Sequence, residues 1–434
     1  MRRIKTLLAT TMAGICLVAC APGETEEEAA EGPTDDVEVD FSTFEGETLD
    51  YIYFTDGPDE QVTRDLIADF EEETGATVNL QILPYDDLEV SLQARLSGDN
   101  VPDVARLTTI APFSNELLDL TRFFGDEYPE EFLPGQVGAV TGAEGEMLAV
   151  PSDLTMNGPF VNVEQFREAG VDLPDPDDPW TVEEMVAAAE EVQAATGTEF
   201  ALAIDKSGHR VSTLLSQFGT TLLDEDGVAL DAGAAEEAVG LLVELMETDA
   251  MSGDFWLQSG SRYEGANEIF AAEEVPVYLA GNWMVAEFAE SVQFEWAVAP
   301  NPCAERCGGF PGGKFMAAFE RSDNPELAAA FVQWMNRTEQ QERLVGEALF
   351  LPTRQDLVSQ GIDYPQRGPD MEVFLADVKR TPEDTYESNA HPAFGATADY
   401  LAEEISETLA EEQDVSTAVE DTIAEAEELV EDAQ

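Results

Sequence analysis

The sequence predicts an α/β fold made of two consecutive units, and three observations lead to this prediction. Strand-like and helix-like patterns alternate between residues 48 and 107, and a second alternation begins near residue 147. Such alternation is typical of a sheet, largely parallel, whose faces are covered by helices. The chain has 434 residues, 44% of them apolar, so it is long enough to bury the cores of two or three compact units.

The first unit has the order strand, helix, strand, helix, strand. Three apolar stretches predict its strands: residues 48–54, 77–83 and 102–107. Apolar residues recur at helical spacing between them, from Val62 to Phe70 and from Leu88 to Leu96, and Gly75 and Gly98 end the two helices. Ligands of such sheets bind beyond the carboxyl ends of the strands, which here are residues 55–57, 84–85 and 106–108.

The second unit starts with extended segments and continues as alternating strands and helices. Thr181 and Glu184, three residues apart, form a capping box at the start of a helix. Three further stretches predict strands, at residues 199–204, 274–281 and 314–319, and each is followed by apolar residues at helical spacing. A hairpin is expected around Asp226-Gly227, and the chain from Asp399 onward is nearly all helical with an acidic outer face.

The charge of the chain is strongly negative, with 92 Asp and Glu against 20 Lys and Arg and a net charge of −72. Normal amounts of large apolar residues accompany these charges, so we expect a folded protein with an acidic shell rather than a disordered one. Salt screens such self-repulsion, with a Debye length of about 3 Å at 1 M, which favours a salt-rich habitat. The same charge argues against nucleic acid or anionic lipid as a partner.

The N-terminal segment has the pattern of an export signal. Basic residues are followed by an apolar run that is short for a membrane span, and Leu17-Val18-Ala19-Cys20 resembles a bacterial lipobox. We expect residues 1–19 to be a lipoprotein signal peptide and Cys20 to carry the lipid anchor, the alternative being an ordinary signal peptide with a chance cysteine. Residues 20–46 are acidic and rich in Pro and Gly, which predicts a disordered tether.

Two cysteines remain after Cys20 and lie four residues apart. A local disulfide between Cys303 and Cys307 is the simplest prediction for an exported chain. Zinc is the rival interpretation, but two thiolates without a nearby histidine supply only half of a site. No metal site and no cofactor are therefore expected.

The order of motifs resembles that of the extracellular solute-binding proteins of ABC importers, in the large sugar-binding family that includes maltose-binding protein. The resemblance runs from about residue 48 to the end. It rests on "DFEEETGATV", "SGDNVPDVARL", "LAVPSDLTMNGPFVNVEQFREAG", "YLAGNWM", "APNPCAERCGGFPGGKF" and "FLPTRQDL", taken in this order and spacing. Two departures are the Phe160-Val161-Asn162 stretch, where the family usually has Tyr-Asn, and the CxxxC insertion.

The resemblance implies a two-lobe periplasmic-binding-protein-like fold with a hinge of about three crossings, near residues 153–157, 299–300 and 349–352, and a helical C-terminal segment. Residues 47–153 with 300–350 would form the N-terminal lobe, and residues 154–299 with 351–434 the C-terminal lobe. The family implies a carbohydrate bound between the lobes and delivered to the membrane subunits of an ABC permease. We expect a monomer on the outer face of the cell membrane, attached by its lipid alone.

The position of Trp283, after a strand and before a helix, suits a flat platform for the apolar face of a sugar, although it also suits core packing. Asp56, Arg106 and Asp153 lie at strand ends or crossings, where a carboxylate or an Arg fork can bind hydroxyls, but each could equally be a surface or paired charge. Glycines permit close backbone approach and mark the rim of the cleft in the family. The remaining candidate residues are His209, Arg210, Tyr263, Phe310, Gly312, Gly313 and Arg354.

Other functions remain open alternatives. A polyol, glycerol phosphate or peptide could replace the sugar as ligand. A glycoside hydrolase needs two cleft carboxylates at a set separation, and the many acidic residues do not exclude it. A Ser-His-Asp triad could draw only on His209 and His391, and no GxSxG motif is present. We therefore expect a binding protein that is not an enzyme.

Overall fold

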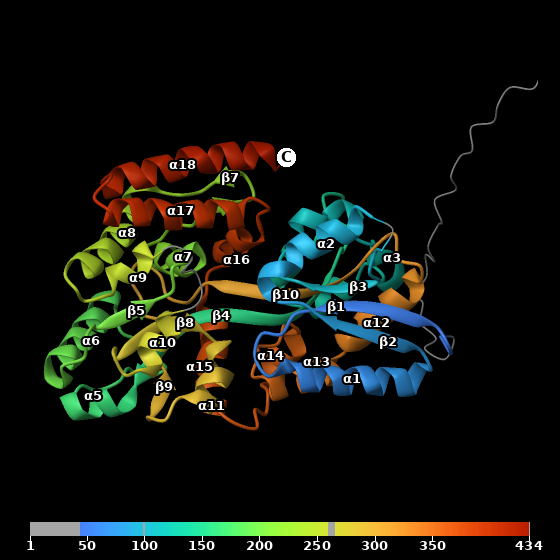
Figure 1. Ribbon diagram of the computed structural model, residues 1–434, viewed down its shortest axis with the longest axis horizontal. Helices are drawn as coiled ribbons and strands as arrows, with labels where there is room; N and C mark the ends of the chain where they lie inside the picture. The colour runs from blue at the N-terminus through green and yellow to red at the C-terminus, as the bar shows by residue number, and fades with distance from the viewer. Residues whose placement is uncertain (1–43, 99, 259–264, 434) are drawn as a thin grey trace, which may run out of the picture.

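A computed structural model describes residues 44–98, 100–258 and 265–433, and it shows two α/β lobes side by side (Figure 1). One sheet runs through both lobes in the order β2-β1-β3-β10-β4-β8-β5, and β9 also pairs with β4. Each lobe has its own cluster of buried apolar side chains. The two-lobe α/β fold expected from the sequence is confirmed. The signal peptide, Cys20 and Tyr263 lie outside the described residues.

The first lobe is built on three parallel strands, as predicted. These are β1 (Thr48–Tyr53), β2 (Thr77–Ile82) and β3 (Val104–Leu107), joined by α1 (Asp59–Thr74) and α2 (Leu88–Leu96). Gly75 ends α1 in the left-handed conformation with a φ of 73°. The carboxyl ends of β1 and β2 point toward the second lobe (Figure 1). Phe44, placed in the tether by the sequence, is instead buried in this lobe, because its ring joins the apolar core.

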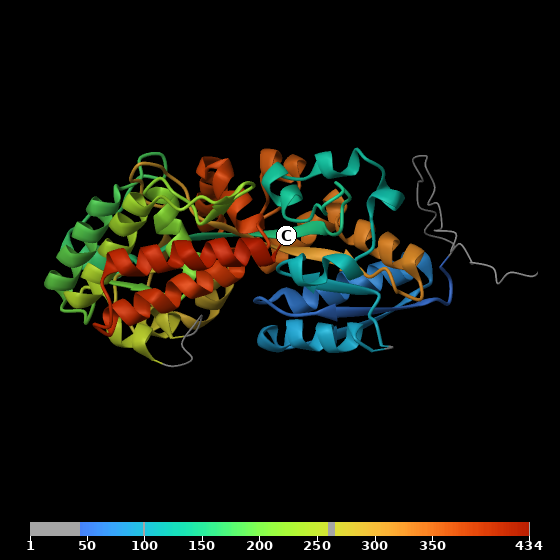
Figure 2. The ribbon, with the colours of Figure 1, turned by 90° about the horizontal axis from the view of Figure 1, so that it is seen from above.

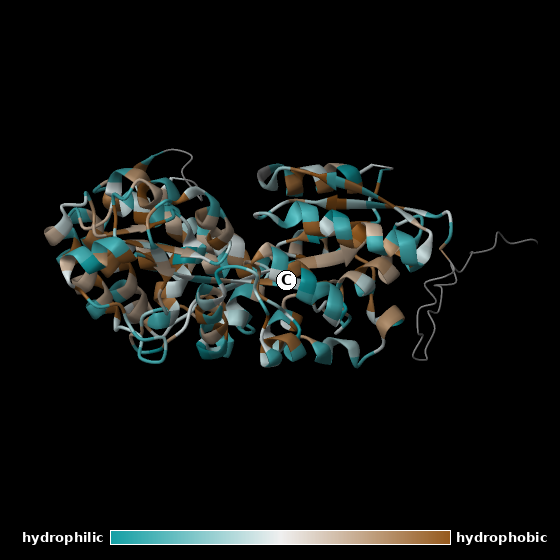
Figure 3. Ribbon diagram, turned by 90° about the horizontal axis from the view of Figure 1, so that it is seen from below, coloured by the Kyte–Doolittle hydropathy of each residue, from teal (hydrophilic) through white to brown (hydrophobic). Residues whose placement is uncertain are grey.

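Further helices cover this sheet. The bounds are α3 (Thr121–Phe124), α4 (Pro134–Gly138), α12 (Pro325–Met335) and α13 (Thr338–Ala348), with short 3-10 turns η2 (Tyr85–Asp87), η3 (Ala111–Glu116) and η4 (Tyr128–Glu131). Trp334 on α12 is buried against Phe70 of α1 and belongs to the core of this lobe. Figure 3 shows hydrophobic residues along the strands and hydrophilic residues on the outer helices.

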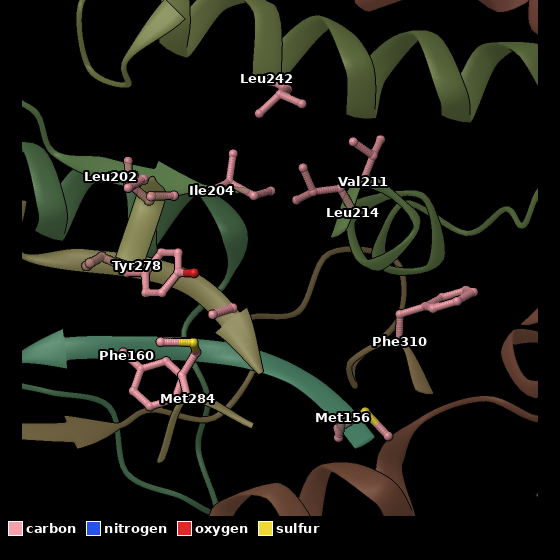
Figure 4. Close-up of a cluster of buried hydrophobic side chains, with 14 of the residues drawn as sticks. Met156, Phe160, Leu202, Ile204, Val211, Leu214, Leu242, Tyr278, Met284 and Phe310 are labelled. Carbon is pink, nitrogen blue, oxygen red and sulfur yellow. The ribbon is translucent and has the colours of Figure 1, made fainter. Parts of the chain in front are cut away.

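The second lobe packs helices around the far half of the sheet. Its elements are α5 (Val163–Ala169), α6 (Val182–Thr196), β5 (Leu202–Ile204), α7 (Gly208–Gln217), β6 (Leu223–Asp224), β7 (Gly227–Val228), α8 (Ala232–Glu247), α9 (Gly253–Leu257), α10 (Ala266–Ala271), β8 (Val277–Gly281), α11 (Met284–Ser291) and β9 (Trp296–Val298). The capping box of Thr181 and Glu184 and the β6-β7 hairpin are both confirmed. Figure 4 shows Phe160, Ile204, Tyr278 and Leu242 among the buried side chains of this core.

The C-terminal segment is helical and belongs mostly to the second lobe. Its helices are α14 (Gln355–Gln360), α15 (Gly368–Arg380), α16 (Glu383–Ala390), α17 (Phe394–Leu409) and α18 (Val415–Asp432). α17 and α18 lie side by side along this lobe (Figures 1 and 2), and α17 packs against α7. The helical tail predicted from residue 399 onward is therefore confirmed.

The two lobes are joined by long antiparallel strands. β4 (Val150–Asn162) is buried along its whole length and pairs with β10 (Pro311–Ala318) at one end and with β8 at the other. A bridge between Leu154 and Leu351 marks a third link. The link that the sequence placed at residues 299–300 lies along β10 instead. Residues 300–310 stay in the second lobe, because Asn301 donates to Asp377 of α15.

The predicted disulfide between Cys303 and Cys307 is present in the structure. It closes a short loop in which Arg306 points toward the end of α7. The Arg306 guanidinium donates to the carbonyl oxygens of Ser216, at 2.7 Å, and Thr220, at 3.2 Å. These carbonyls lie at the C-terminal end of the helix, where a cation is favoured by the helix dipole. The loop therefore holds one end of α7, and the other end carries candidate site residues.

Candidate functional site

The start of α7 places His209 and Arg210 at the junction of the lobes. Gly208, the first residue of the helix, packs directly on α17, because a Cβ atom there would lie 1.8 Å from the carbonyl oxygen of Ala398. Only glycine permits this approach. The close contact fixes where α7 begins and therefore where the two following side chains point.

Arg210 is almost fully buried and has partners on three elements. Its Nε donates to Asp205, 3.2 Å away, and its Nη1 donates to the side-chain oxygen of Asn157 on β4, 3.0 Å away. Its guanidinium lies over the ring of Trp283, 4.1 Å from the centroid. Asp205 also accepts a hydrogen bond from the Tyr278 hydroxyl. Burial raises the pKa of Asp205, although both donors favour its charged form.

His209 is partly exposed and is held as a neutral ring. Its Nε2 lies 3.0 Å from the carbonyl oxygen of Pro311, and its Nδ1 lies 3.0 Å from Arg210 Nη1 and 3.3 Å from Asn157 Nδ2. Because two donors face Nδ1, the proton belongs on Nε2, which donates to Pro311. Burial and the neighbouring Arg210 charge lower the pKa of His209 to about 3.

Trp283 follows β8 and precedes the first residue of α11. Its ring folds back over Gly281, where a Cβ atom would lie 2.0 Å from the ring. The ring is partly exposed, whereas Trp256 and Trp296 are buried. The same segment meets the first lobe, because a Cβ atom on Gly57 would lie 4.0 Å from Cβ of Ala286 on α11. Trp283 therefore lies near the place where the lobes touch.

Asp56, after β1, forms an ion pair with Lys314 of β10. Burial opposes the charged form of Asp56, but Lys314 and Arg106 outweigh it and lower its pKa, and Arg210 acts in the same direction. The side chains of Asp56 and Lys314 keep 26% and 10% of their surface exposed. We name the set Trp283, Arg210, His209, Asp56 and Lys314 the junction cluster.

Arg106 and Asp153, expected to face a ligand, lie in the interior instead. Arg106 is 2% exposed and donates to Asp153, at 2.9 Å, and to Asp59, at 3.1 Å, both of which are fully buried. Its guanidinium also lies 4.7 Å from the ring centroid of Phe54. β10 pairs with β3 along its length, and the rings of Tyr53, Phe54 and Phe350 lie against the guanidinium. The charges are therefore shielded from solvent and pair with each other. The network ties the hinge strand β4 to the first lobe.

Phe310 is also buried, because its ring stacks on Phe394 of α17 with centroids 5.2 Å apart. Arg354 is 7% exposed and pairs with Glu131 and Asp356, so it ties the third link to the first lobe. Arg354 therefore lies outside the junction cluster, whereas Phe310 packs beneath it, with its ring edge-on to the His209 ring at a centroid distance of 4.9 Å. In the described structure they support the lobes that carry the cluster.

Gly312 and Gly313 lie on β10, where it passes the cluster. A Cβ atom on Gly312 would lie 2.5 Å from the Thr155 hydroxyl and 3.4 Å from His209 Nε2. A Cβ atom on Gly313 would lie 2.4 Å from the side-chain oxygen of Gln136. The glycines thus allow close packing of β10 against its neighbours, and Gly312 brings the strand next to His209.

Lys314, Asp205 and Asn157 belong to the site but were absent from the candidates chosen from sequence. Asp205 follows directly after the strand predicted at residues 199–204, so the same carboxyl-end rule that selected Asp56 would have found it. Lys314 and Asn157 lie inside hinge strands. Only the pairing of those strands shows that they reach the cluster.

The described residues contain no group of three or more His, Cys, Asp or Glu side chains that could hold a metal ion. In the same part of the chain, the helices are all too short or too polar to cross a membrane. The junction cluster instead combines a flat aromatic ring with donors and acceptors from both lobes. Such an arrangement can bind a small polar molecule that also has an apolar face.

A family model described as bacterial extracellular solute-binding protein matches residues 56–342. The chain belongs to this family. The resemblance inferred from the order of motifs is thereby confirmed, and membership places the protein outside the cytoplasm. No curated protein matches this solute-binding protein in sequence.

Solved structures share its fold over most of its length. The GacH receptor of Streptomyces glaucescens, solved unliganded and with acarbose, is similar with a TM-score of 0.74 and 21% identity, over 89% of this chain and 99% of that one. A cyclic alpha-maltosyl-1,6-maltose binding protein from Arthrobacter globiformis has a TM-score of 0.72 and 22% identity, over 89% of this chain and 98% of that one. The ABC substrate-binding protein Lmo0181 from Listeria monocytogenes, in complex with cycloalternan, has a TM-score of 0.70 and 17% identity, over 88% of this chain and 98% of that one.

Proposed function

We propose that this solute-binding protein captures a neutral carbohydrate at the junction cluster and delivers it to the membrane subunits of an ABC importer. The observation that carries the proposal is the partly exposed ring of Trp283, held by Arg210 beside polar groups from both lobes. Sugars present flat C–H faces that pack on aromatic rings, and their hydroxyls bind carboxylates, amines and imidazoles. The cluster supplies the ring, the carboxylate and the amine, whereas both ring nitrogens of His209 already have protein partners.

The charges of the cluster favour a neutral ligand over a phosphate ester. Arg210 is paired with Asp205, and Lys314 is paired with Asp56. Each cation therefore already has a carboxylate, and a phosphate group would have to displace one of them or remain poorly neutralised. Hydroxyl groups can instead join such pairs as donors and acceptors without adding charge.

The sugar ligands of the structures with this fold support the same class. The GacH receptor binds acarbose, and the Arthrobacter and Listeria proteins are described with cyclic oligosaccharides. The Listeria protein is also an ABC substrate-binding protein. We extend this class and this transport role to the present chain, and we expect the protein itself to do no chemistry on the sugar.

The N-terminal segment completes the proposal. Cleavage before Cys20 and lipidation of that residue would attach the protein to the outer face of the cell membrane. The acidic residues that follow would keep the lobes away from anionic lipid heads by repulsion. The lobes would then meet the permease as a monomer. Globomycin treatment, which blocks lipoprotein cleavage, should leave a larger precursor, and Cys20→Ala should release the protein from membranes.

A thermal-shift panel tests ligand capture. The chain from residue 20, with Cys20→Ser, is heated in high salt with mono- and oligosaccharides, polyols and glycerol 3-phosphate. A ligand at 100 times its Kd stabilises the protein by about 2.7 kcal/mol, which raises Tm. We expect stabilisation by at least one neutral sugar, and chromatography should recover that sugar unchanged. Stabilisation by glycerol phosphate alone, or turnover of the sugar, would contradict the proposal.

A further inference from the structure

Tyr85 is one of three large apolar side chains that the described residues expose, and 46% of its surface is exposed. It follows Pro84 at the end of β2 and starts the 3-10 turn η2. β1 and β2 are parallel neighbours that pair up to Tyr53 and Ile82. Tyr85 therefore lies at the same edge of the sheet as Asp56, one strand further from the hinge.

The ring of Tyr85 has a rigid support on its inner side. Its centroid lies 5.2 Å from that of Phe54, which is only 2% exposed. Phe54 in turn lies under the Arg106 guanidinium, which the buried carboxylates of Asp59 and Asp153 hold in place. A ring that is backed by a buried stack and still half exposed loses little conformational freedom when it contacts a ligand.

The backbone around Tyr85 is also fixed. Pro84 has a φ of −58°, and the Asp87 amide donates to the Pro84 carbonyl oxygen over 3.1 Å, which closes the turn ahead of α2. Figure 1 shows this end of the first-lobe sheet facing the second lobe, and Ala286 of α11 approaches the neighbouring loop at Gly57. The exposed ring thus belongs to the side of the first lobe that faces the lobe of Trp283.

We infer that Tyr85 is a second aromatic platform for the carbohydrate, on the lobe opposite Trp283, and that the ligand contains at least two sugar rings. The inference rests on the proposed function. β2 lies one strand spacing, about 4.8 Å, from β1, so the loop that carries Tyr85 is next to the loop that carries Asp56. One ring of the ligand is bound at the junction cluster, and the next ring stacks on Tyr85.

The alternative is that Tyr85 only packs on Phe54. The two roles differ in how the effect of a substitution depends on ligand length. A packing residue changes the stability of the protein and affects all ligands alike. A platform for the second ring changes the affinity for disaccharides and trisaccharides but not for a monosaccharide.

Calorimetric titration of one-, two- and three-ring members of the maltose, cellobiose and mannobiose series tests this inference. In the series that binds, Tyr85→Ala should weaken the two- and three-ring sugars by about tenfold and leave the monosaccharide within about twofold. Tyr85→Phe, which keeps the ring, should restore most of the affinity for the longer sugars that Tyr85→Ala loses. Val90→Ala removes an apolar side chain of α2 that is 71% exposed, and it is the matched control.

Two failures can be told apart. Suppose that the wild-type chain binds one sugar series and that Tyr85→Ala binds the one-, two- and three-ring members of that series as tightly. The inference that Tyr85 is a second platform is then wrong, and the proposed function stands. The same holds if Tyr85→Ala weakens the monosaccharide as much as the longer sugars. If the wild-type chain binds no member of any series, the proposed function fails for these sugars, and the inference fails with it.

Discussion

The Arg210 guanidinium lies over the Trp283 ring at 4.1 Å and is at the same time paired with the buried carboxylate of Asp205. One face of the indole is therefore covered by a cation that cannot move without leaving a buried charge behind. A ligand that contacts Trp283 must therefore use the part of the ring surface that Arg210 and Gly281 leave uncovered. Arg210 therefore stabilises the fold by pairing with Asp205, and it supports ligand binding by holding the Trp283 ring in place.

Replacing Arg210 with alanine should be strongly destabilising. The substitution leaves the Asp205 carboxylate buried without its partner, which typically costs about 3–5 kcal/mol. The double variant Arg210→Ala with Asp205→Asn removes the unpaired charge and should recover part of that loss. Denaturant unfolding of the two single variants and the double variant measures the coupling. Simple additivity of the two single effects would contradict the pairing.

Gly281→Ala should displace the Trp283 ring. The added methyl group would lie 2.0 Å from the ring and 2.8 Å from the Met156 carbonyl oxygen. We expect sugar affinity to fall by tenfold or more, because the platform moves. Gly240→Ala, in α8, is the control, since a Cβ atom there meets nothing within 4 Å and alanine favours a helix. Unchanged affinity in Gly281→Ala would show that the ring does not bind the sugar.

The His209 ring should make stability depend on pH in one direction. Its pKa is about 3 in the folded protein and about 6.5 in the unfolded chain. The unfolded state therefore binds the extra proton between these values, so the stabilisation is complete above about pH 6.5 and is lost as the pH falls toward 3. Relative to His209→Gln, the wild type should lose stability from pH 7 to pH 4 in denaturant unfolding. A constant difference would contradict the neutral ring.

The acidic surface should make the protein depend on salt. A net charge of −72 repels itself, and salt screens that repulsion, so Tm should rise strongly from low salt to molar NaCl or KCl. Sucrose is the control, because it stabilises folded proteins by exclusion without screening charge. If sucrose and salt at equal osmolality gave the same rise, or if salt had no effect, screening of the acidic shell would not be the cause.

The elements of the fold were largely predictable, because periodicity and capping are local signals. Neighbouring residues were enough to predict three local features. These are the apolar stripe of α1 from Val62 to Phe70, the capping box at Thr181, and the position of Trp283 between β8 and α11. The burial of Arg106 did not follow from neighbouring residues, because β10 pairs beside β3 and Phe350 lies against the guanidinium, and both come more than two hundred residues later in the chain. The burial of Phe310 did not follow either, since Phe394 of α17, which stacks on it, lies far along the chain.

The pairing of charges in the junction cluster was not predictable either. In a chain with 92 acidic residues, the sequence does not show which carboxylate will meet Lys314 or Arg210. The partners Asp56 and Asp205 follow strands of different lobes, and they reach the same place only because β4 and β10 run through both. The candidate site therefore depends on the hinge, which is set by long-range pairing.

Titration calorimetry of wild type, Trp283→Ala and Trp180→Ala with the sugar that stabilises the protein most is the most direct test of the central claim. Trp180 is a fitting control, because it is also partly exposed but stacks on Phe166, in a different part of the second lobe. The account predicts that Trp283→Ala weakens binding by at least about tenfold, as expected for losing a buried aromatic contact, and that Trp180→Ala stays within about twofold. Wild-type affinity in a folded Trp283→Ala variant would contradict it.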